Sequence, residues 1–202
     1  MRLLPCGMDG VLVEVDDVYQ VVPLAETLRA DVDVVETVPG ARTVLVRTRR
    51  EVSAALRERI TAAAAAGTAA REPAAVRDVV ELTVRYDGPD LRSTAAELDM
   101  TPDELIAVHS GREYVVAFCG FAPGFAYVTG LDERLHVARL AEPRTRVPAG
   151  SVGVAGEFTG VYPRESPGGW RLLGRTEAQL WDATADPPAL LVPGTPVRFR
   201  PS

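Results

Sequence analysis

The residue types best suited to chemistry gather in three glycine-rich clusters in the second half of the chain. The first combines His109 with the segment Gly120–Tyr127, Gly-Phe-Ala-Pro-Gly-Phe-Ala-Tyr. Gly120 and Gly124 permit tight turns or the close approach of a ligand to the backbone, and an imidazole exchanges protons near neutral pH. Aromatic rings could form the wall of a pocket, so we expect a binding site that also uses Phe121, Pro123, Phe125 and Tyr127.

The second cluster is built around arginine. Arg144 and Arg146 follow Pro143, and a Pro-Ala-Gly-Ser turn ends at Ser151. A guanidinium presents paired donors that match a carboxylate or a phosphate. We expect Arg144 to bind such a group, together with Pro148, Gly150 and Ser151.

The third cluster spans residues 156–176 and is rich in glycine and hydroxyl groups, with Arg175 near its end. Such a segment can line an anion site, because backbone amides, hydroxyls and a guanidinium all donate hydrogen bonds to bound charge. The other residues that we expect to contact a ligand are Thr159, Tyr162, Ser166, Gly168, Gly169 and Trp170.

Each cluster also has a purely structural interpretation, because glycine and proline are common in turns and aromatic side chains fill the interior of β-barrels. His109 is expected at the C-terminal end of a helix over 102–108, where the helix dipole favours the protonated imidazole. Alternatively, it is a capping or core histidine. Cys119 is expected to be a small buried residue, because a reactive thiolate needs a basic neighbour. The spacing defines no Ser-His-Asp order.

Composition excludes several classes of function. The 202-residue chain has a net charge of −6, so it lacks the basic field that a sequence-independent nucleic-acid binder needs. No apolar run approaches the roughly 20 residues that cross a bilayer. Early acidic residues are untypical of a signal peptide, and two cysteines are too few for a disulfide framework. We expect a cytoplasmic protein without nucleic-acid or membrane partners.

The basic residues are all arginine, 22 in number. Without lysine, the chain offers neither a P-loop for ATP nor Schiff-base chemistry. Two histidines and two cysteines without CxxC or HExxH spacing indicate no metal site.

The elements that must position the clusters fall into two parts. Residues 1–77 predict an α+β domain, with strands over 11–15, 34–38 and 43–48 and a helix over 24–30. The turn at 39–42 joins the last two strands in a hairpin.

A second helix is predicted after these strands. Thr48 and Glu51 have capping-box spacing, and the helix ends at Gly67. Its apolar face carries Val52, Leu56, Ile60 and Ala63. Residues 72–74 read as an exposed connection.

Residues 78–202 begin with a predicted strand over 79–84, and Asp90 is a suitable cap for a helix over 91–98. Thr101-Pro-Asp-Glu104 is a strong helix start, with a cap residue, proline at the first helical position and a closing glutamate. Beyond 111, a helical pattern occurs only at 177–182. The strands predicted there are short, over 114–118, 151–155, 189–192 and 195–200, which indicates an all-β barrel or sandwich.

Several linked motifs in this order resemble the family of 5-oxoprolinase B subunits, also named allophanate hydrolase subunit 1, which includes the kinase inhibitor KipI. The match covers roughly residues 2–200 and is densest from 86 onward. The motifs are Tyr86–Asp90, His109 with Tyr114–Tyr127, Pro143-Arg144, Val147–Gly156, Thr159–Pro163, Ser166–Trp170, Gly174–Thr176 and Pro193–Phe199. One departure is Phe158, where many relatives have glutamine.

The resemblance implies an α+β fold, with a cyclophilin-like β-barrel as the second domain. It implies two partners, the homologous C subunit and the A subunit, in a complex that opens 5-oxo-L-proline to L-glutamate with ATP and Mg²⁺. In that setting His109 would act as acid or base, Arg144 and Arg175 would neutralise phosphate or carboxylate, and nearby hydroxyls would bind oxyanions.

Two other functions remain open at this point. One is a KipI-like inhibitor that docks on a sensor histidine kinase. The other is a carboxyltransferase-type component of a urea carboxylase or allophanate system, which handles carboxybiotin. Fold alone does not choose among them.

Overall fold

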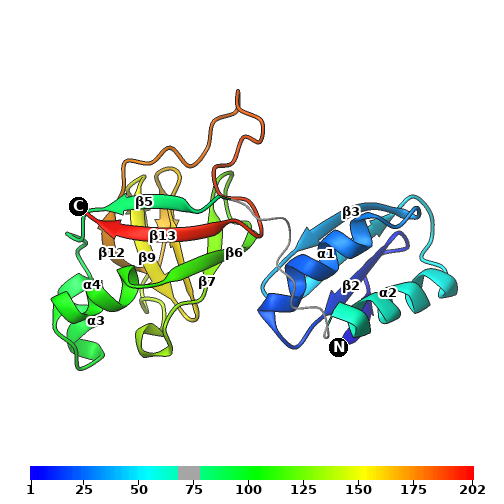
Figure 1. The fold of residues 1–202 in the computed structure, drawn as a ribbon, viewed down its shortest axis with the longest axis horizontal. Helices are drawn as coiled ribbons and strands as arrows, with labels where there is room; N and C mark the ends of the chain where they lie inside the picture. Colours follow the sequence, from blue (N-terminus) through cyan, green and yellow to red (C-terminus); the bar gives the residue numbers. More distant parts are fainter. Residues whose placement is uncertain (68–77) are drawn as a thin grey trace. The chain divides into compact units, whose positions relative to one another are not determined.

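A computed structural model describes residues 1–67 and 78–202 of the chain (Figure 1). The chain divides into two compact units, residues 1–76 and 77–202, and each is treated by itself. The connection predicted at residues 72–74 lies outside the described residues. Within the described parts, no helix is long and apolar enough to cross a membrane.

The first unit is a four-stranded antiparallel sheet with helices on one face (Figure 1). Valines of the two central strands alternate into the core, where they meet the buried leucines and isoleucine of the two helices. The strand order is β1-β2-β4-β3. The elements are β1 (Arg2–Pro5), β2 (Gly10–Glu14), η1 (Val18–Gln20), α1 (Val21–Arg29), β3 (Val34–Pro39), β4 (Thr43–Thr48) and α2 (Ala54–Gly67).

The predicted hairpin of β3 and β4 is confirmed, but the predicted start of α2 is wrong. Thr48 belongs to β4, and its hydroxyl donates to the backbone oxygen of Asp9. The helix begins later, because Ser53 accepts a hydrogen bond from the Leu56 amide and so acts as the cap. Leu56 and Ile60 are buried as predicted, and the helix ends at Gly67.

The second unit is a seven-stranded sheet that curves into a nearly closed barrel (Figure 1). The strand order is β12-β9-β10-β7-β6-β13-β5. Arg85, just after β5, exchanges both backbone hydrogen bonds with Arg175 at the end of β12, which links the two sheet edges. The strands are β5 (Val80–Val84), β6 (Glu113–Cys119), β7 (Ala126–Thr129), β9 (Ser151–Ala155), β10 (Phe158–Val161), β12 (Arg171–Arg175) and β13 (Pro196–Pro201).

Smaller elements complete this unit. Helices α3 (Leu91–Glu97) and α4 (Pro102–Ser110) follow β5, η2 (Glu133–Leu135) follows β7, and β8 (Arg144–Val147) pairs with β11 (Ser166–Gly168) as a separate ribbon. The capping box of α4 is confirmed, because the side chains of Thr101 and Glu104 each accept from the other residue's backbone amide. Asp90 precedes α3, but its carboxylate does not cap the helix. The mixed α+β fold with a β-barrel is therefore as predicted.

Two predicted elements near the C-terminus are wrong. Residues 177–182 form no helix, and residues 189–192 form no strand, apart from one bridge between Trp181 and Ala189. Leu180 is buried, whereas its neighbours Gln179 and Trp181 are more accessible, the alternation of extended chain rather than of a helix. Prolines at 187, 188 and 193 flank residues 189–192 on both sides, and they cannot extend a strand's backbone hydrogen bonding because proline has no N–H.

Candidate functional site

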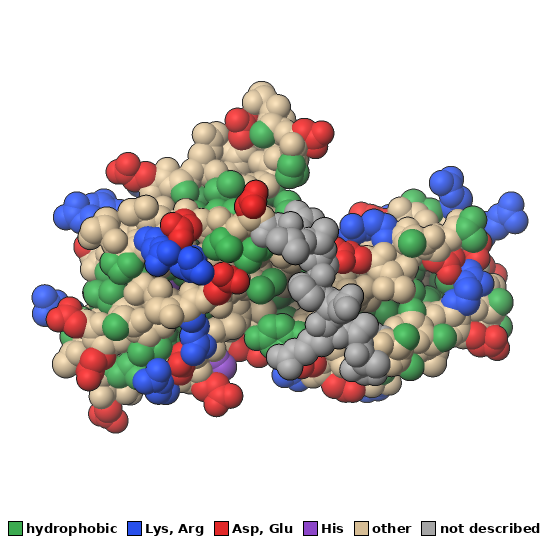
Figure 2. Space-filling model, viewed as in Figure 1, with side chains coloured by type: hydrophobic (Ala, Val, Ile, Leu, Met, Phe, Trp, Pro, Cys, Tyr) green, Lys and Arg blue, Asp and Glu red, His purple; other side chains and the backbone are tan. Residues whose placement is uncertain are grey.

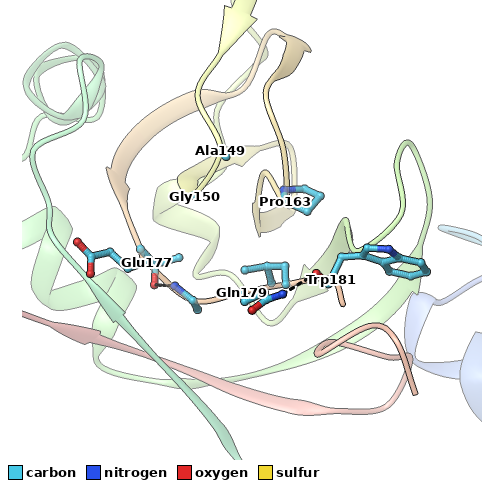
Figure 3. A pocket seen from close by; sticks show the side chains of 9 residues that line it. Ala149, Gly150, Pro163, Glu177, Gln179 and Trp181 are labelled. Carbon is cyan, nitrogen blue, oxygen red and sulfur yellow. Dashed lines mark hydrogen bonds between the residues drawn. The ribbon is translucent and has the colours of Figure 1, made fainter. Parts of the chain in front are cut away.

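A pocket of about 280 Å³ opens on the second unit (Figure 3). Three segments form it: the turn between β8 and β9, the chain just after β10, and the extended segment that follows β12. Its lining residues are Ala149, Gly150, Pro163, Thr176, Glu177, Ala178, Gln179, Leu180 and Trp181.

Gly150 holds these three segments together. Its φ is +76°, and a Cβ there would lie 2.2 Å from the backbone oxygen of Thr176, so glycine is required both by conformation and by space. Its amide donates to the oxygen of Tyr162, and its oxygen accepts from the Thr176 amide. This close approach of the Gly150 backbone to Thr176 therefore shapes the pocket wall.

The loop 120–125 packs against the end of the pocket formed by Trp181. Gly124 has a φ of +81°, and a Cβ there would lie 2.9 Å from the Cβ of Trp181 and 3.2 Å from that of Pro163. The same loop holds Phe121 at a φ of +69°, a conformation that non-glycine residues rarely adopt. Figure 3 shows Trp181 at one end of the 176–181 segment and Glu177 at the other.

The predicted aromatic residues lie mostly beneath the surface. Phe125, Tyr162 and Trp170 are buried, and the Phe125 ring meets the other two edge to face at centroid distances of 5.3 and 5.4 Å. Such contacts stabilise a rigid layer. Of the predicted aromatic residues, Phe121 is the exposed one, and Tyr127 lies between these extremes.

His109 lies inside the barrel and does not line the pocket. Its side chain is fully buried between Tyr114 and Phe199. Nδ1 lies 2.7 Å from the Tyr86 hydroxyl, and Nε2 lies 2.9 Å from the Thr159 hydroxyl.

These hydrogen bonds fix the tautomer of His109. Thr159 donates its hydroxyl hydrogen to the oxygen of Gly153, so it accepts from Nε2–H, and Nδ1 accepts from Tyr86. Burial lowers the pKa of His109 to about 3. The expectation of a protonated imidazole at the helix end is therefore wrong, because desolvation outweighs the helix dipole. The buried, fully bonded ring favours the core interpretation over proton transfer.

Both predicted arginines are held in ion pairs. Arg144 Nη2 lies 2.6 Å from Oδ1 of Asp90, and Oδ2 of Asp90 accepts from the Leu172 amide at 2.7 Å. Arg175 Nη2 lies 3.1 Å from Asp87. Neither arginine lines the pocket, so their binding of a ligand anion stays a prediction.

The remaining predicted residues are spread around the barrel. Of all the predicted site residues, Gly150 alone lines the pocket. Ser151 and Thr159 are buried, and the Ser166 hydroxyl donates to the oxygen of Arg164. Burial raises the pKa of Cys119 to about 11, which suits the inert role expected of it. Five more predicted site residues also lie outside the pocket lining: Gly120, Pro123, Pro148, Gly168 and Gly169.

The pocket segment 177–181 was not among the predicted site residues, because it was predicted to be a helix.

The pocket lining sets its chemistry. Glu177 is its one charged residue, so the lining can accept hydrogen bonds from an N–H group but contains no cation to neutralise a carboxylate or phosphate. The Thr176 hydroxyl accepts from the Ala178 amide and forms a small turn. Among the described residues, no group of three metal-binding side chains occurs.

The small α+β unit and the nearly closed barrel lie in a region that matches a family of carboxyltransferase domains. Residues 1–191 match the family described as carboxyltransferase domain, subdomain C and D, and the chain belongs to this family. Within it, the chain is a member of the group of 5-oxoprolinase B subunits. It is 44% identical over 183 residues to the 5-oxoprolinase B subunit of Escherichia coli O157:H7, and the match covers 88% of this chain and 83% of that protein.

Solved structures share the fold of this chain. A crystal structure of TTHA0988 is 34% identical and superposes with a TM-score of 0.78 over 96% of this chain; the match spans 40% of the length of that chain. The urea amidolyase of K. lactis superposes over 99% of this chain with a TM-score of 0.73, at 20% identity and over 15% of its own length. This second likeness concerns the fold alone.

Proposed function

We propose that the chain is the B subunit of a cytoplasmic, ATP-dependent 5-oxoprolinase that converts 5-oxo-L-proline to L-glutamate. The observation that carries the proposal is the 44% identity to a 5-oxoprolinase B subunit across 83% of that relative's length. The complex would also contain the A and C subunits, and ATP with Mg²⁺ would bind at the level of the complex.

The substrate is a lactam, whose amide resonance resists attack by water. The lactam oxygen displaces ADP from the γ-phosphorus of ATP, and water adds to the activated carbon. The ring C–N bond then breaks to leave an amine and an acyl phosphate, and a second water releases phosphate. These reaction steps have two requirements: a site that holds the lactam, and cationic groups that hold the phosphates.

We assign the first of these requirements to the pocket. Glu177 and the carboxamide oxygen of Gln179 can accept from the lactam N–H, and the Trp181 indole offers an apolar wall for the ring. The pocket lining has no cation, and the chain has no lysine and thus no P-loop. The groups that bind the phosphates and the substrate carboxylate therefore lie outside this pocket lining, on Arg144 and Arg175 of this chain or on the other components of the complex.

The test is reconstitution with the A and C subunits, with each component omitted in turn. Release of ADP and formation of glutamate should both require this chain. Within the active complex, Glu177→Gln should raise KM for 5-oxoproline about tenfold, because a weaker acceptor replaces a charged one. Glu165→Gln, outside the pocket, is the matched control. Full turnover without this chain would contradict the proposal.

Carboxyl transfer is a second candidate, because the family is defined by carboxyltransferase subdomains. In that case the assembled complex would consume carboxybiotin and would not release ADP in response to 5-oxoproline. The same reconstitution distinguishes the two activities.

A further inference from the structure

The hydroxyl of Tyr162 lies beside the ribbon formed by β8 and β11. A Cβ added at Gly168 of β11 would overlap the hydroxyl oxygen, and Gly168 pairs with Arg144 of β8. The ring of Phe121 packs edge to face on the Tyr162 ring at a centroid distance of 6.2 Å. A group that can both donate and accept a hydrogen bond therefore lies next to an arginine strand position, at the edge of an aromatic cluster.

Positive charge surrounds this hydroxyl. Burial raises the pKa of Tyr162, and a backbone hydrogen bond from Trp170 opposes the rise. The charges of Arg139 and Arg144 oppose it too, and within the described residues no carboxylate acts on this hydroxyl. Arg139 is exposed and forms no ion pair in the described part of the chain. The surroundings of the Tyr162 hydroxyl therefore favour a negatively charged ligand.

Arg144 has hydrogen-bonding capacity to spare. Its Nη2 atom lies 2.6 Å from Oδ1 of Asp90, but Nη1 is buried and has no hydrogen-bond partner among residues 1–67 and 78–202. A buried guanidinium N–H without an acceptor is uncommon and costly. The side chain as a whole is 28% exposed, so a ligand can approach it from solvent. An anion bound there would supply the acceptor that Nη1 lacks.

Other arginines of this unit are offset by acids. On β13, Arg198 and Arg200 lie 3.3 and 2.7 Å from the carboxylate of Glu81. Figure 2 shows basic and acidic side chains close together on the face that carries β5 and β13 in Figure 1. Little net charge remains there to attract an anion. Arg139 and Arg164, by contrast, are exposed and have no carboxylate partner in the described ranges.

We propose that Arg139 and Arg144, with the hydroxyl of Tyr162, form a subsite for a small oxyanion, a carboxylate or a phosphate. Guanidinium groups provide paired donors that match both anions. The identity of the ligand rests on the proposed function, in which the oxyanion is the carboxylate of 5-oxoproline or a phosphate of ATP.

The subsite borders the pocket. Pro163 lines the pocket and directly follows Tyr162 in the sequence. Loop 120–125 touches both places: a Cβ at Gly124 would lie 3.2 Å from that of Pro163, and the Phe121 ring contacts Tyr162. An oxyanion held by the two arginines would therefore lie close to a pocket whose own lining has no cation.

Isothermal titration calorimetry of the purified full chain tests the subsite independently of turnover. The probes are 5-oxoproline, inorganic phosphate and pyrrolidin-2-one, which is the same lactam without the carboxylate. Arg139→Gln should weaken binding of the oxyanion by about 10- to 100-fold, because it removes a charged donor. It should leave the binding of pyrrolidin-2-one unchanged. Arg92→Gln is the matched control, because Arg92 is an exposed arginine on α3 without an ion pair in the described residues.

A second variant tests the hydroxyl. Tyr162→Phe keeps the ring and its aromatic contacts and removes one neutral donor, so it should weaken oxyanion binding by about 3- to 10-fold. Circular dichroism and thermal melting establish that each variant is folded before binding is measured.

Each outcome supports or overturns the subsite. A loss in Arg139→Gln that is confined to 5-oxoproline identifies the carboxylate, a loss confined to phosphate identifies a phosphate, and a loss of both also supports the subsite. No binding of either oxyanion, or equal effects of Arg139→Gln and Arg92→Gln, overturns it. Turnover that needs this chain but is unaffected by Arg139→Gln removes the subsite and leaves the proposed function standing. Phosphate binding that depends on Arg139, in a chain whose complex does not turn over 5-oxoproline, removes the proposed function instead.

Discussion

The imidazole of His109 and the hydroxyl of Thr159 form a buried hydrogen bond of 2.9 Å that ties α4 to β10. The residues are 50 positions apart in the sequence. On the other side of the ring, Tyr86 adds a hydrogen bond from the chain just after β5. A single neutral side chain thus joins three parts of the barrel, which makes His109 important for stability.

His109→Ala should therefore destabilise the protein by about 2–4 kcal/mol, because it leaves a cavity and unpaired hydroxyls. Urea unfolding, followed by tryptophan fluorescence, measures this change. His136→Ala, at an exposed histidine, should change stability by less than about 0.5 kcal/mol. An equally large loss of stability in both variants, or no loss in either, would refute the structural role of His109.

The same residue makes stability depend on pH. The pKa of His109 is about 3 in the folded protein and about 6.5 in an unfolded chain. The unfolded state therefore binds the proton more tightly, and stability that is fully present above pH 6.5 is lost as the pH falls toward 3. At pH 5 the loss should be about 2 kcal/mol, at about 1.4 kcal/mol per pH unit. In His109→Phe this slope between pH 6.5 and 5 should be absent.

Arg144 is expected to be structural through its ion pair with Asp90. Arg144→Met should destabilise the protein by about 2–4 kcal/mol, because Asp90 is buried and loses its charged partner. Arg146→Met breaks an exposed pair with Glu165 and should cost less than about 1 kcal/mol. Equal effects of the two substitutions in thermal melting would show that the Asp90 pair contributes little.

Sequence patterns predicted the parts of the fold that depend on local chemistry. The hairpin of β3 and β4 and the capping box at Thr101 follow from neighbouring residues. The placement of His109 did not, because its burial depends on β10 and β13, which are distant in sequence. The ion pair of Arg144 could not be predicted for the same reason, because its partner Asp90 is 54 positions away in the sequence. The arginines were therefore expected to have guanidinium groups free to bind an anion.

The last prediction concerns Gly150, the residue that joins the three pocket segments. Gly150→Ala should shift the segment after β12, because the new methyl group would lie 2.2 Å from the Thr176 oxygen. Gly156→Ala is the matched control: its φ is also positive, at +57°, but nothing lies within 4 Å of the added carbon. We expect Gly156→Ala to lower the free energy of unfolding by about 1 kcal/mol through backbone strain alone, and Gly150→Ala to lower it by more.

In the reconstituted complex, the Gly150 variant should also raise KM for 5-oxoproline, while the Gly156 variant should not. Equal losses of stability and unchanged KM in both would mean that Gly150 serves the turn alone and does not shape the pocket.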